Sequence, residues 1–354
     1  MRDLIRVLVL GAGRMGSGVA RVPLDKEGLE IVGACDPRGD LSGSDIGRIC
    51  GLDEDTGITV ESDLATALSH SRPDIAIQAT GSTLTSVAAD IELLLEHGAS
   101  VISIAEEMAF PWCQSEATAR RLHELAVRHE AVVLGTGINP GFVLDLLIIA
   151  LTGVCAQVTS IAASRSNDLS PYGPTVLKAQ GVGLTPDEFQ RGVQAGTITG
   201  HVGFDQSLHM IAASLGWRIE RVEQTLDPIV ARIPREAPLV RVEPGQVAGC
   251  LHRAIAHVDG RPAITLTHPQ QVCPDAEDIP TSDRIEIRGR PDICLEGTPE
   301  IPGGEGTAAI VVNMIPRVLG ATPGLRTMAD LPVPAALHGD MRSFVQPIAE
   351  RRHG

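Results

Sequence analysis

The chain has 354 residues, 43% of them hydrophobic, which is long enough for two domains with sizeable cores. Its 29 basic and 44 acidic residues give a net charge of −15, a balance that argues against nucleic-acid partners and anionic membranes. The most apolar stretch, 144–151, is too short to cross a bilayer. The seven cysteines have no CxxC spacing, and a strand pattern begins almost at the first residue, where a signal peptide would lie. We therefore expect a cytoplasmic protein with reduced thiols and no membrane span.

The first predicted strand, 5–10, runs directly into a turn of the pattern GxGxxG. Gly11 permits a tight turn, Gly13 lets the backbone approach a pyrophosphate, and Gly16 lets the following helix lie close to the strand. The free N–H groups at the start of that helix would face the phosphate. A strand before the turn and a helix after it predict a dinucleotide-binding loop. The predicted cofactor contacts here are Gly11, Gly13, Arg14, Met15 and Gly16.

The second predicted strand, 30–35, ends at Asp36. An acidic residue at this place binds the ribose hydroxyls of the adenosine and favours NAD. Arg38 follows two residues later and can receive the 2′-phosphate of NADP, although an arginine in a solvated loop is the alternative reading. The pattern is mixed, and it predicts that the protein uses both NAD and NADP.

Three further strands alternate with helices before residue 140. These elements are strands at 74–79, 101–104 and 131–135 and helices at 84–97 and 114–129. The alternation predicts the α/β class, with an N-terminal Rossmann domain built on a doubly wound parallel sheet over residues 1–140.

Ligands of such a sheet lie beyond the carboxyl ends of its strands. The third strand is followed there by Thr80, Gly81 and Ser82, small residues that let a nicotinamide or ribose pass. The fourth is followed by Glu106 and Glu107, of which one can hold a substrate ammonium or exchange a proton with an amine nitrogen. Two like charges close together also raise one pKa. The alternative is an acidic start to the next helix, stabilised by its dipole.

The fifth strand delivers the segment 135–141, which contains three glycines, Asn139 and Pro140. Asn139 can bond a carboxamide or a polar group of a substrate. The alternative is an elaborate turn into a helix at 142–151. Asp145 lies in that otherwise apolar helix and needs a partner, which is more often a structural role.

Residues 141–306 carry short β-rich runs separated by turns. The pattern predicts an α+β second domain with a mixed or antiparallel sheet, and we expect that sheet to pair across a two-fold axis in a homodimer. The apolar segment 307–325 is predicted as a helix that completes the first domain, although Pro316 complicates it.

Two polar segments of the second domain can supply substrate contacts. The first is a predicted loop over 165–174, which contains Arg165 and the only tyrosine of the chain, Tyr172. The second places His201 between two glycines and close to Phe204. A capping or surface histidine is the alternative for His201. No histidine shows metal-ligand spacing, and we expect no metal.

Together these segments resemble the 2,4-diaminopentanoate dehydrogenases and the related native amine dehydrogenases, which are built like dihydrodipicolinate reductase. The matching segments are the glycine loop, SIAEEMAFPW (103–112), GTGINPGFVLD (135–145), RSNDLSPYGP (165–174), GHVGFDQS (200–207) and TAAIVVNMIPRVL (307–319). The resemblance implies NAD(P)-dependent oxidative deamination of an amine, or reductive amination of a ketone with ammonia. It leaves open whether the substrate is 2,4-diaminopentanoate or a simple alkylamine.

The resemblance also implies roles for residues. Glu107 matches the key glutamate after the fourth strand, with Glu106 as the second choice, and Tyr172 matches a tyrosine that lines the substrate pocket. The implied substrate contacts are Tyr172, His201, Asn139, Ile138 and Arg165, the last as a partner for a carboxylate. The chain lacks the lysine that dihydrodipicolinate reductases carry near residues 164–167, which argues against that reaction.

Two other functions remain open on the sequence. One is a dehydrogenase of another small polar substrate, such as a semialdehyde or a hydroxy acid. The other is a non-catalytic nucleotide-binding protein. A requirement for ammonia in the reductive direction separates the amine dehydrogenase from the first, and turnover separates it from the second.

Overall fold

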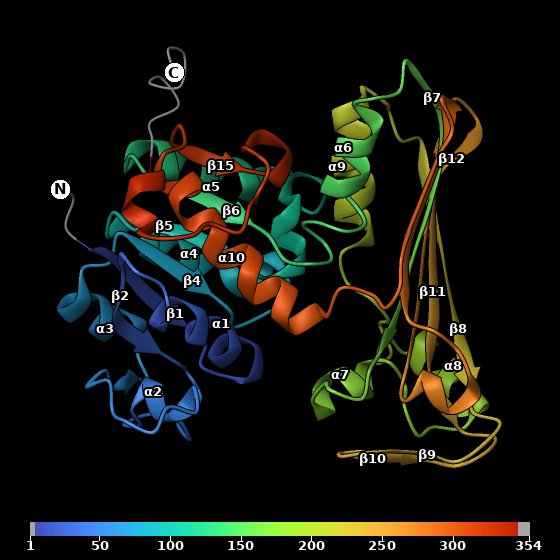
Figure 1. Ribbon diagram of the computed structural model, residues 1–354, viewed down its shortest axis with the longest axis horizontal. Helices are drawn as coiled ribbons and strands as arrows, with labels where there is room; N and C mark the ends of the chain where they lie inside the picture. The colour runs from blue at the N-terminus through green and yellow to red at the C-terminus, as the bar shows by residue number, and fades with distance from the viewer. Residues whose placement is uncertain (1–3, 346–354) are drawn as a thin grey trace. The chain divides into compact units, whose positions relative to one another are not determined.

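The computed structural model describes residues 4–345, which fold into two compact units (Figure 1). The first unit runs to Phe142 and resumes at Pro302, and the second spans Val143–Ile301. The sequence places these boundaries at 140 and 306. The chain thus leaves the first unit once and returns to it.

The first unit is built on a seven-stranded sheet in which all neighbouring strands run parallel, in the order β15-β6-β5-β4-β1-β2-β3. The strands are β1 (Ile5–Leu10), β2 (Leu29–Cys35), β3 (Val60–Glu61), β4 (Ile75–Gln78), β5 (Ser100–Ser103), β6 (Val132–Gly135) and β15 (Gly324–Arg326). The predicted doubly wound parallel sheet is confirmed. The two additional edge strands have two and three residues, too few to show a hydrophobic period in the sequence.

Helices cover both faces of this sheet. The helices of the unit are α1 (Arg14–Leu24), α2 (Ile46–Ile49), α3 (Leu64–Ser71), α4 (Leu84–Glu96), α5 (Glu116–Arg128), α10 (Gly303–Leu319) and the 3-10 turns η1 (Glu106–Ala109), η2 (Pro111–Cys113), η4 (Met328–Asp330) and η5 (Met341–Phe344). Leu8 and Leu10 of β1 pack in the apolar cluster of α3, α4 and α5, whereas Val9 packs in the cluster of α1 and α2. Side chains alternate along a strand, so burial on both faces makes these strands almost continuously apolar.

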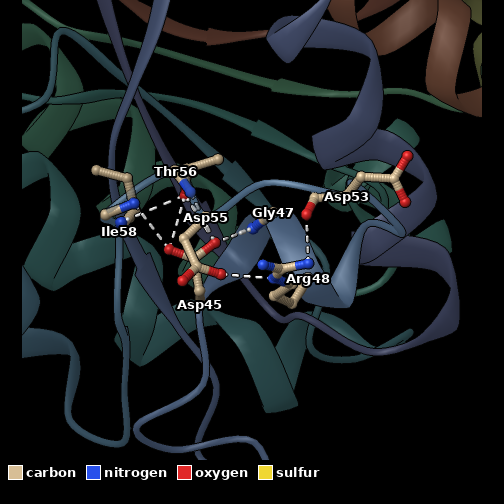
Figure 2. A network of polar contacts seen from close by, with 8 residues as sticks. Asp45, Gly47, Arg48, Asp53, Asp55, Thr56 and Ile58 are labelled. Atoms are coloured by element: carbon tan, nitrogen blue, oxygen red, sulfur yellow. Dashed lines mark hydrogen bonds and ion pairs between the residues drawn. The ribbon is translucent and has the colours of Figure 1, made fainter.

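The segment between β2 and β3 is organised around the Asp45 carboxylate (Figure 2). It accepts the N–H groups of Gly47 at 2.8 Å, Thr56 at 3.0 Å and Gly57 at 2.8 Å, and the Thr56 hydroxyl at 3.0 Å. Arg48 closes the other side of the segment through the Asp55 carboxylate. One side chain therefore fixes a segment that has little regular structure.

The helix near the end of the chain is shorter than the predicted 307–325. It ends at Leu319, and Gly324–Arg326 forms strand β15 beside β6 instead. Gly324 has φ +126°, and a Cβ there would lie 2.7 Å from the ring of His123. The prediction of helix beyond 319 was wrong because Gly320, Pro323 and this tight contact end the helix and turn the chain into the sheet.

The second unit contains a six-stranded mixed sheet in the order β14-β13-β7-β12-β11-β8, in which only β7 and β12 run parallel. Its strands are β7 (Gln157–Asp168), β8 (Arg221–Val230), β11 (Val247–Val258), β12 (Arg261–Gln271), β13 (Ser282–Arg290) and β14 (Ile293–Gly297), and a separate pair is β9 (Arg235–Ala237) and β10 (Val240–Val242). Its helices are α6 (Leu146–Thr152), α7 (Pro174–Ala179), α8 (Pro186–Gln194), α9 (Phe204–Leu215) and the 3-10 turn η3 (Pro274–Glu277). The predicted α+β class with a mixed sheet is confirmed.

Two details of this unit correct the sequence reading. Arg165 lies within β7, which continues to Asp168, so the predicted loop over 165–174 begins only after that residue. Asp145 lies at the N-cap of α6, where its carboxylate accepts the N–H of Leu146 at 2.6 Å, and it also accepts the Ser207 hydroxyl at 3.0 Å. The end of β7 was predicted as a loop because its buried residues, Arg165 and Asn167, are polar and alternate with half-buried serines.

Candidate active site

The glycine loop has the shape that a dinucleotide requires. Gly11 has φ +97°, and a Cβ there would lie 2.6 Å from the carbonyl oxygen of Ala79. A Cβ at Gly16 would lie only 1.8 Å from the carbonyl oxygen of Gly11. Gly13 is the N-cap of α1, and Arg14 and Met15 form its first turn. The first N–H groups of α1 therefore follow directly on a tight glycine turn, an arrangement that fits a pyrophosphate.

Asp36 follows β2 and is 2% exposed, and its carboxylate is already engaged. It accepts the N–H of Ala12 at 2.7 Å, the N–H of Arg38 at 2.9 Å, and Nε and Nη2 of the Arg38 guanidinium at 3.0 and 2.9 Å. Burial raises the pKa of this carboxyl, but the hydrogen bonds from Arg38 and Ala12 outweigh burial and hold the pKa below its ordinary value. The Asp36 carboxylate and the Arg38 guanidinium thus form an ion pair.

Arg38 lies against the glycine loop. A Cβ at Gly13 would be 3.1 Å from its Nη2, so this glycine leaves room for the guanidinium. The Arg38 side chain remains 55% exposed. A cation held at the edge of the phosphate cradle by a buried carboxylate is well placed to meet a phosphate.

The carboxyl end of β4 leads to Thr80, Gly81 and Ser82, as predicted for the third long strand. A Cβ at Gly81 would lie 2.5 Å from the Ser86 hydroxyl, so the chain passes close to the start of α4. The Ser82 side chain bonds the carboxyl group of Glu106. Ser82 therefore has a contact that its sequence context did not suggest.

The two adjacent glutamates after β5 have different environments. Glu107 is 9% exposed, and its Oε2 accepts the N–H of Leu84, the first residue of α4, at 2.6 Å. Its own N–H donates to the carbonyl oxygen of Ser82 at 3.1 Å. The Glu107 carboxylate thus caps a helix N-terminus, where negative charge is stabilised.

Glu106 is half-buried and carries the raised pKa of the pair. Burial raises the pKa of its carboxyl to about 7, bonds from its own N–H and from Ser82 oppose this rise, and the charge of Glu107 adds to it. Near neutral pH both the acid and the carboxylate are therefore populated, which is the property that acid–base exchange requires.

The segment after β6 lies against the turn that carries the glutamates. A Cβ at Gly135 would be 1.9 Å from the carbonyl oxygen of Met108 in η1. The N–H of Ile138 donates to the Thr307 hydroxyl of α10 at 3.1 Å, and Asn139 follows, joined to Pro140 by a cis peptide. The structure therefore brings Ile138 and Asn139 to the same end of the first unit as the glutamates.

In the second unit, Arg165 is 2% exposed and already paired. Its Nη1 lies 2.6 Å from Oδ1 of Asp283, and its Nη2 donates to the carbonyl oxygen of Ile301 at 2.5 Å. The other Asp283 oxygen accepts the N–H of Ile301 at 2.9 Å. This pairing argues against the predicted carboxylate contact, because Asp283 neutralises the charge that would attract a substrate.

Tyr172 and Asn167 lie near Arg165 on the covered side of the sheet. The half-buried Tyr172 hydroxyl bonds the Asn167 side chain. Burial raises the pKa of the phenol, and the charges of Glu300 and Asp168 add to the rise, whereas Arg165 and Asn167 oppose it. The tyrosine is therefore neutral at any ordinary pH.

His201 belongs to a cluster of three histidines. Its ring centroid lies 4.8 Å from that of His268 and 4.9 Å from that of Phe204, and its backbone N–H donates to Nδ1 of His252 at 3.1 Å. Burial lowers the pKa of His201 to about 3 and that of His252 to about 4, and it lowers the pKa of His268 well below the ordinary value. All three rings are neutral near pH 7.

The partners of these rings are polar side chains of the second unit. Nε2 of His268 lies 3.0 Å from Oδ1 of Asn167, and Nε2 of His252 lies 3.0 Å from Oε1 of Gln224. Nε2 of His201 is buried and has no hydrogen-bond partner among residues 4–345. A buried ring nitrogen without a hydrogen bond destabilises the fold, and a bound ligand could supply the missing bond.

The sequence interpretation missed His252, His268 and Asn167. A signal exists for one of them: His268 follows Ile264 and Leu266 at alternate positions of a buried strand, where a polar residue is unusual. Within residues 4–345 no group of three or more His, Cys, Asp or Glu side chains could hold a metal ion. No helix in that part of the chain is long and apolar enough to span a membrane.

Comparisons with known proteins agree with this architecture. Residues 142–347 match the family of the 2,4-diaminopentanoate dehydrogenase C-terminal domain, and residues 5–104 match the dihydrodipicolinate reductase N-terminus. A 2,4-diaminopentanoate dehydrogenase of Acetoanaerobium sticklandii is 41% identical over 98% of this chain and 99% of its own. The solved structure of an amine dehydrogenase from Mycobacterium smegmatis is 28% identical with a TM-score of 0.85, over 95% of this chain and 98% of its own. The chain therefore belongs to the 2,4-diaminopentanoate dehydrogenase family.

Proposed function

We propose that the protein is an NAD(P)-dependent amine dehydrogenase, which interconverts an amine with a ketone and ammonia. The observation that carries the proposal is Glu106, a half-buried carboxyl at the carboxyl end of a Rossmann strand whose pKa burial raises to about 7. The family membership and the 41% identical relative support the same reaction class.

Glu106 would act on the amine nitrogen. Its carboxylate form binds an ammonium or iminium group by charge, and its acid form returns a proton to nitrogen in the reductive direction. A nicotinamide cofactor whose pyrophosphate lies at the glycine loop would accept or supply the hydride. The protein's part is to hold the amine carbon in position and to keep water from the half-buried carboxyl.

Glu106 takes precedence over Glu107 in this proposal. Resemblance alone favours Glu107, but its carboxylate already accepts the N–H of Leu84. Moving it to a substrate would leave the N–H of Leu84 without its acceptor. We assign acid–base exchange to Glu106, and a supporting role to Glu107.

For the cofactor we propose use of both NAD and NADP. Arg38 beside Gly13 can bind a 2′-phosphate, and its movement toward that phosphate would free the Asp36 carboxylate only in part, because Ala12 also binds it. With NAD, one Asp36 oxygen can accept a ribose hydroxyl if Arg38 turns to solvent.

For the substrate we propose an amine that carries a second polar group, of which 2,4-diaminopentanoate is the example that the relative suggests. The neutral imidazole of His201, whose buried Nε2 has no hydrogen-bond partner among residues 4–345, and the neutral phenol of Tyr172 carry acceptor atoms without positive charge, which suits a second ammonium group. Simple alkylamines offer nothing to these acceptors. We keep Tyr172, His201, Asn139 and Ile138 as substrate contacts.

A direct screen tests the function. The purified protein is assayed at alkaline pH for reduction of NAD and NADP with 2,4-diaminopentanoate and with simple alkylamines, and with Glu106→Gln as control. Reduction that depends on the amine, and ketone reduction that requires ammonia, are the expected results. Oxidation of NAD(P)H by a semialdehyde or keto acid without ammonia would instead favour the other dehydrogenase reading, and cofactor binding without turnover would favour a nucleotide-binding protein.

We further propose a cytoplasmic homodimer that pairs through the second unit. The seven cysteines are all free thiols, which suits a reducing compartment. Along β7 the residues between the buried ones, such as Ala162 and Ser164, are small and at least partly exposed. The open face of a sheet can meet its own copy across a two-fold axis. Sedimentation analysis gives the mass, and a monomer at micromolar concentration would contradict the dimer.

A further inference from the structure

A chain of buried polar side chains joins the carboxyl ends of β4 and β5 in the first unit. Gln78 and Ser103, the last residues of these strands, are both 0% exposed. The Ser103 hydroxyl donates to Oε1 of Gln78, and Nε2 of Gln78 donates to the Thr80 hydroxyl at 2.7 Å. The N–H of Ala105 donates to the Ser103 hydroxyl at 3.1 Å. The chain therefore ties together the two segments that follow these strands.

The direction of these bonds is determined by their ends. The Thr80 hydroxyl bonds the Asp90 carboxylate of α4, which only accepts, so Thr80 donates to Asp90 and accepts from the Gln78 amide. At the other end the Ala105 N–H can only donate, so Ser103 accepts from it and donates to the Gln78 oxygen. Position 78 therefore needs a side chain with one donor and one acceptor.

Both segments that these hydrogen bonds hold in place contact Glu106. Ala105 immediately precedes it and is the N-cap of η1. Ser82 follows Thr80 by two residues, bonds the Glu106 carboxyl through its side chain, and accepts the N–H of Glu107 at 3.1 Å. Displacement of either segment would move the Glu106 carboxyl.

We propose that Gln78 and Ser103 are positioning residues for Glu106: they fix the backbone on both sides of its carboxyl and so hold it in its half-buried place. The inference rests on the proposed function only in giving Glu106 the acid–base role. Because Gln78 and Ser103 are fully buried, they act through Ala105 and Thr80 and do not contact a substrate.

Two variants and one matched control test this positioning. Ser103→Ala removes a hydroxyl, and Gln78→Met removes the donor and the acceptor at similar length. Ser71→Ala is the control: its hydroxyl is also buried in the first unit, but it bonds the carbonyl oxygen of Ala67 before β4 begins. Infrared spectra of each protein are recorded across pH, and the spectra of the same protein with Glu106→Gln added are subtracted. The difference reports the titration of the Glu106 carboxyl. Amine oxidation gives kcat and KM for each.

We expect the Glu106 titration in both variants to move from a pKa of about 7 toward the ordinary carboxyl range, because a loosened carboxyl reaches water. We expect kcat to fall about tenfold or more, with KM for the cofactor within about twofold, since a small misplacement acts on the chemical step. Ser71→Ala should change neither.

The inference is overturned if Ser103→Ala and Gln78→Met keep both the wild-type titration of Glu106 and the wild-type kcat, whether or not their thermal stability falls. The infrared titration needs no turnover. A protein that oxidises no amine, yet shifts its Glu106 titration in the two variants, would therefore refute the proposed function and leave the positioning of Glu106 supported.

Discussion

At the scale of single residues, identical side chains side by side acquire different chemistry from their partners. Glu106 and Glu107 are indistinguishable as letters in the sequence. The N–H of Leu84 binds Glu107, whereas burial beside Ser82 raises the pKa of Glu106 to about 7. Asp36 and Arg38 show the same principle, because the two candidate recognition groups for the cofactor bind each other.

The glutamate assignment predicts different losses for the two conservative variants. Glu106→Gln should lower kcat for amine oxidation by about 100-fold or more, since it removes a group that exchanges protons, while cofactor affinity stays within about twofold. Glu107→Gln keeps an oxygen that can accept the N–H of Leu84, so kcat should fall less than about tenfold. Steady-state kinetics and cofactor titration by fluorescence measure both. A larger loss of kcat in Glu107→Gln would return the catalytic role to Glu107.

The Arg38 contact predicts a change of cofactor preference. Arg38→Ala removes a phosphate partner and frees the Asp36 carboxylate, so the ratio of kcat/KM for NADP over NAD should fall by about 10-fold to 100-fold. Arg48→Ala removes another exposed arginine of the same region, paired with Asp55, and should leave the ratio unchanged. An unchanged ratio in Arg38→Ala would show that the 2′-phosphate binds elsewhere.

At the scale of elements, several boundaries depend on individual polar or tight contacts. Asp145 starts α6 as its N-cap, and the packing of His123 against Gly324 accompanies the change from α10 to β15. The segment around Asp45 has only one four-residue helix, yet four hydrogen-bond donors meet its carboxylate (Figure 2). The ends of these elements are fixed by contacts of single side chains, which a hydrophobic periodicity in the sequence does not reveal.

The Asp45 contacts predict a measurable stability difference within one segment. Asp45→Ala should lower the free energy of unfolding at pH 7 by about 2 kcal/mol, because it leaves several N–H groups without their acceptor. Asp55→Ala, which breaks only the exposed pair with Arg48, should cost less than about 1 kcal/mol. Urea denaturation of both variants gives the comparison, and equal losses would refute the central role of Asp45.

At the scale of the whole molecule, each unit concentrates one kind of chemistry. The first presents the glycine loop, the Asp36–Arg38 pair and the glutamates at the carboxyl ends of its parallel strands. The second collects neutral polar groups, namely Tyr172, Asn167 and the three histidines, on the covered side of its sheet. A parallel sheet brings its loops to one edge, and a mixed sheet brings alternate side chains to one face.

The buried histidines predict how stability depends on pH. Their folded-state pKa values lie below the unfolded value of 6.5, near 3 for His201 and 4 for His252, so the unfolded chain binds more protons between these limits. Stability should therefore fall as pH drops from about 6.5 to 4. The raised pKa of Glu106 acts in the opposite sense, since stability from its protonated form is lost as pH rises from about 4.5 to 7.

The measurement is the midpoint of thermal unfolding between pH 4 and 8. His252→Gln should flatten the acid side of the curve, and Glu106→Gln should make it steeper, because each removes one of the two opposing contributions. An acid side that is equally steep in the wild type and in His252→Gln would contradict the neutral state of His252.

Much of the fold, and part of the candidate site, can be predicted from local sequence patterns. The glycine loop, the long strands and the α4 and α5 helices have periods and end signals that the sequence carries by itself. Tyr172 and His201 stand out as rare polar aromatics in glycine-rich surroundings. His252 and His268 do not, because their place on a covered sheet face depends on strand pairings with residues far along the chain.

The sequence by itself determined that this chain binds a dinucleotide on a parallel sheet, because strand, glycine turn and helix are continuous in the chain. It also determined which short segments carry polar groups. Only the tertiary structure gave Glu106 and Glu107 different partners, and only it paired Arg165 with Asp283 and Arg38 with Asp36. The physical reason is that burial and partners set the charge and the pKa of a side chain, and folding supplies both.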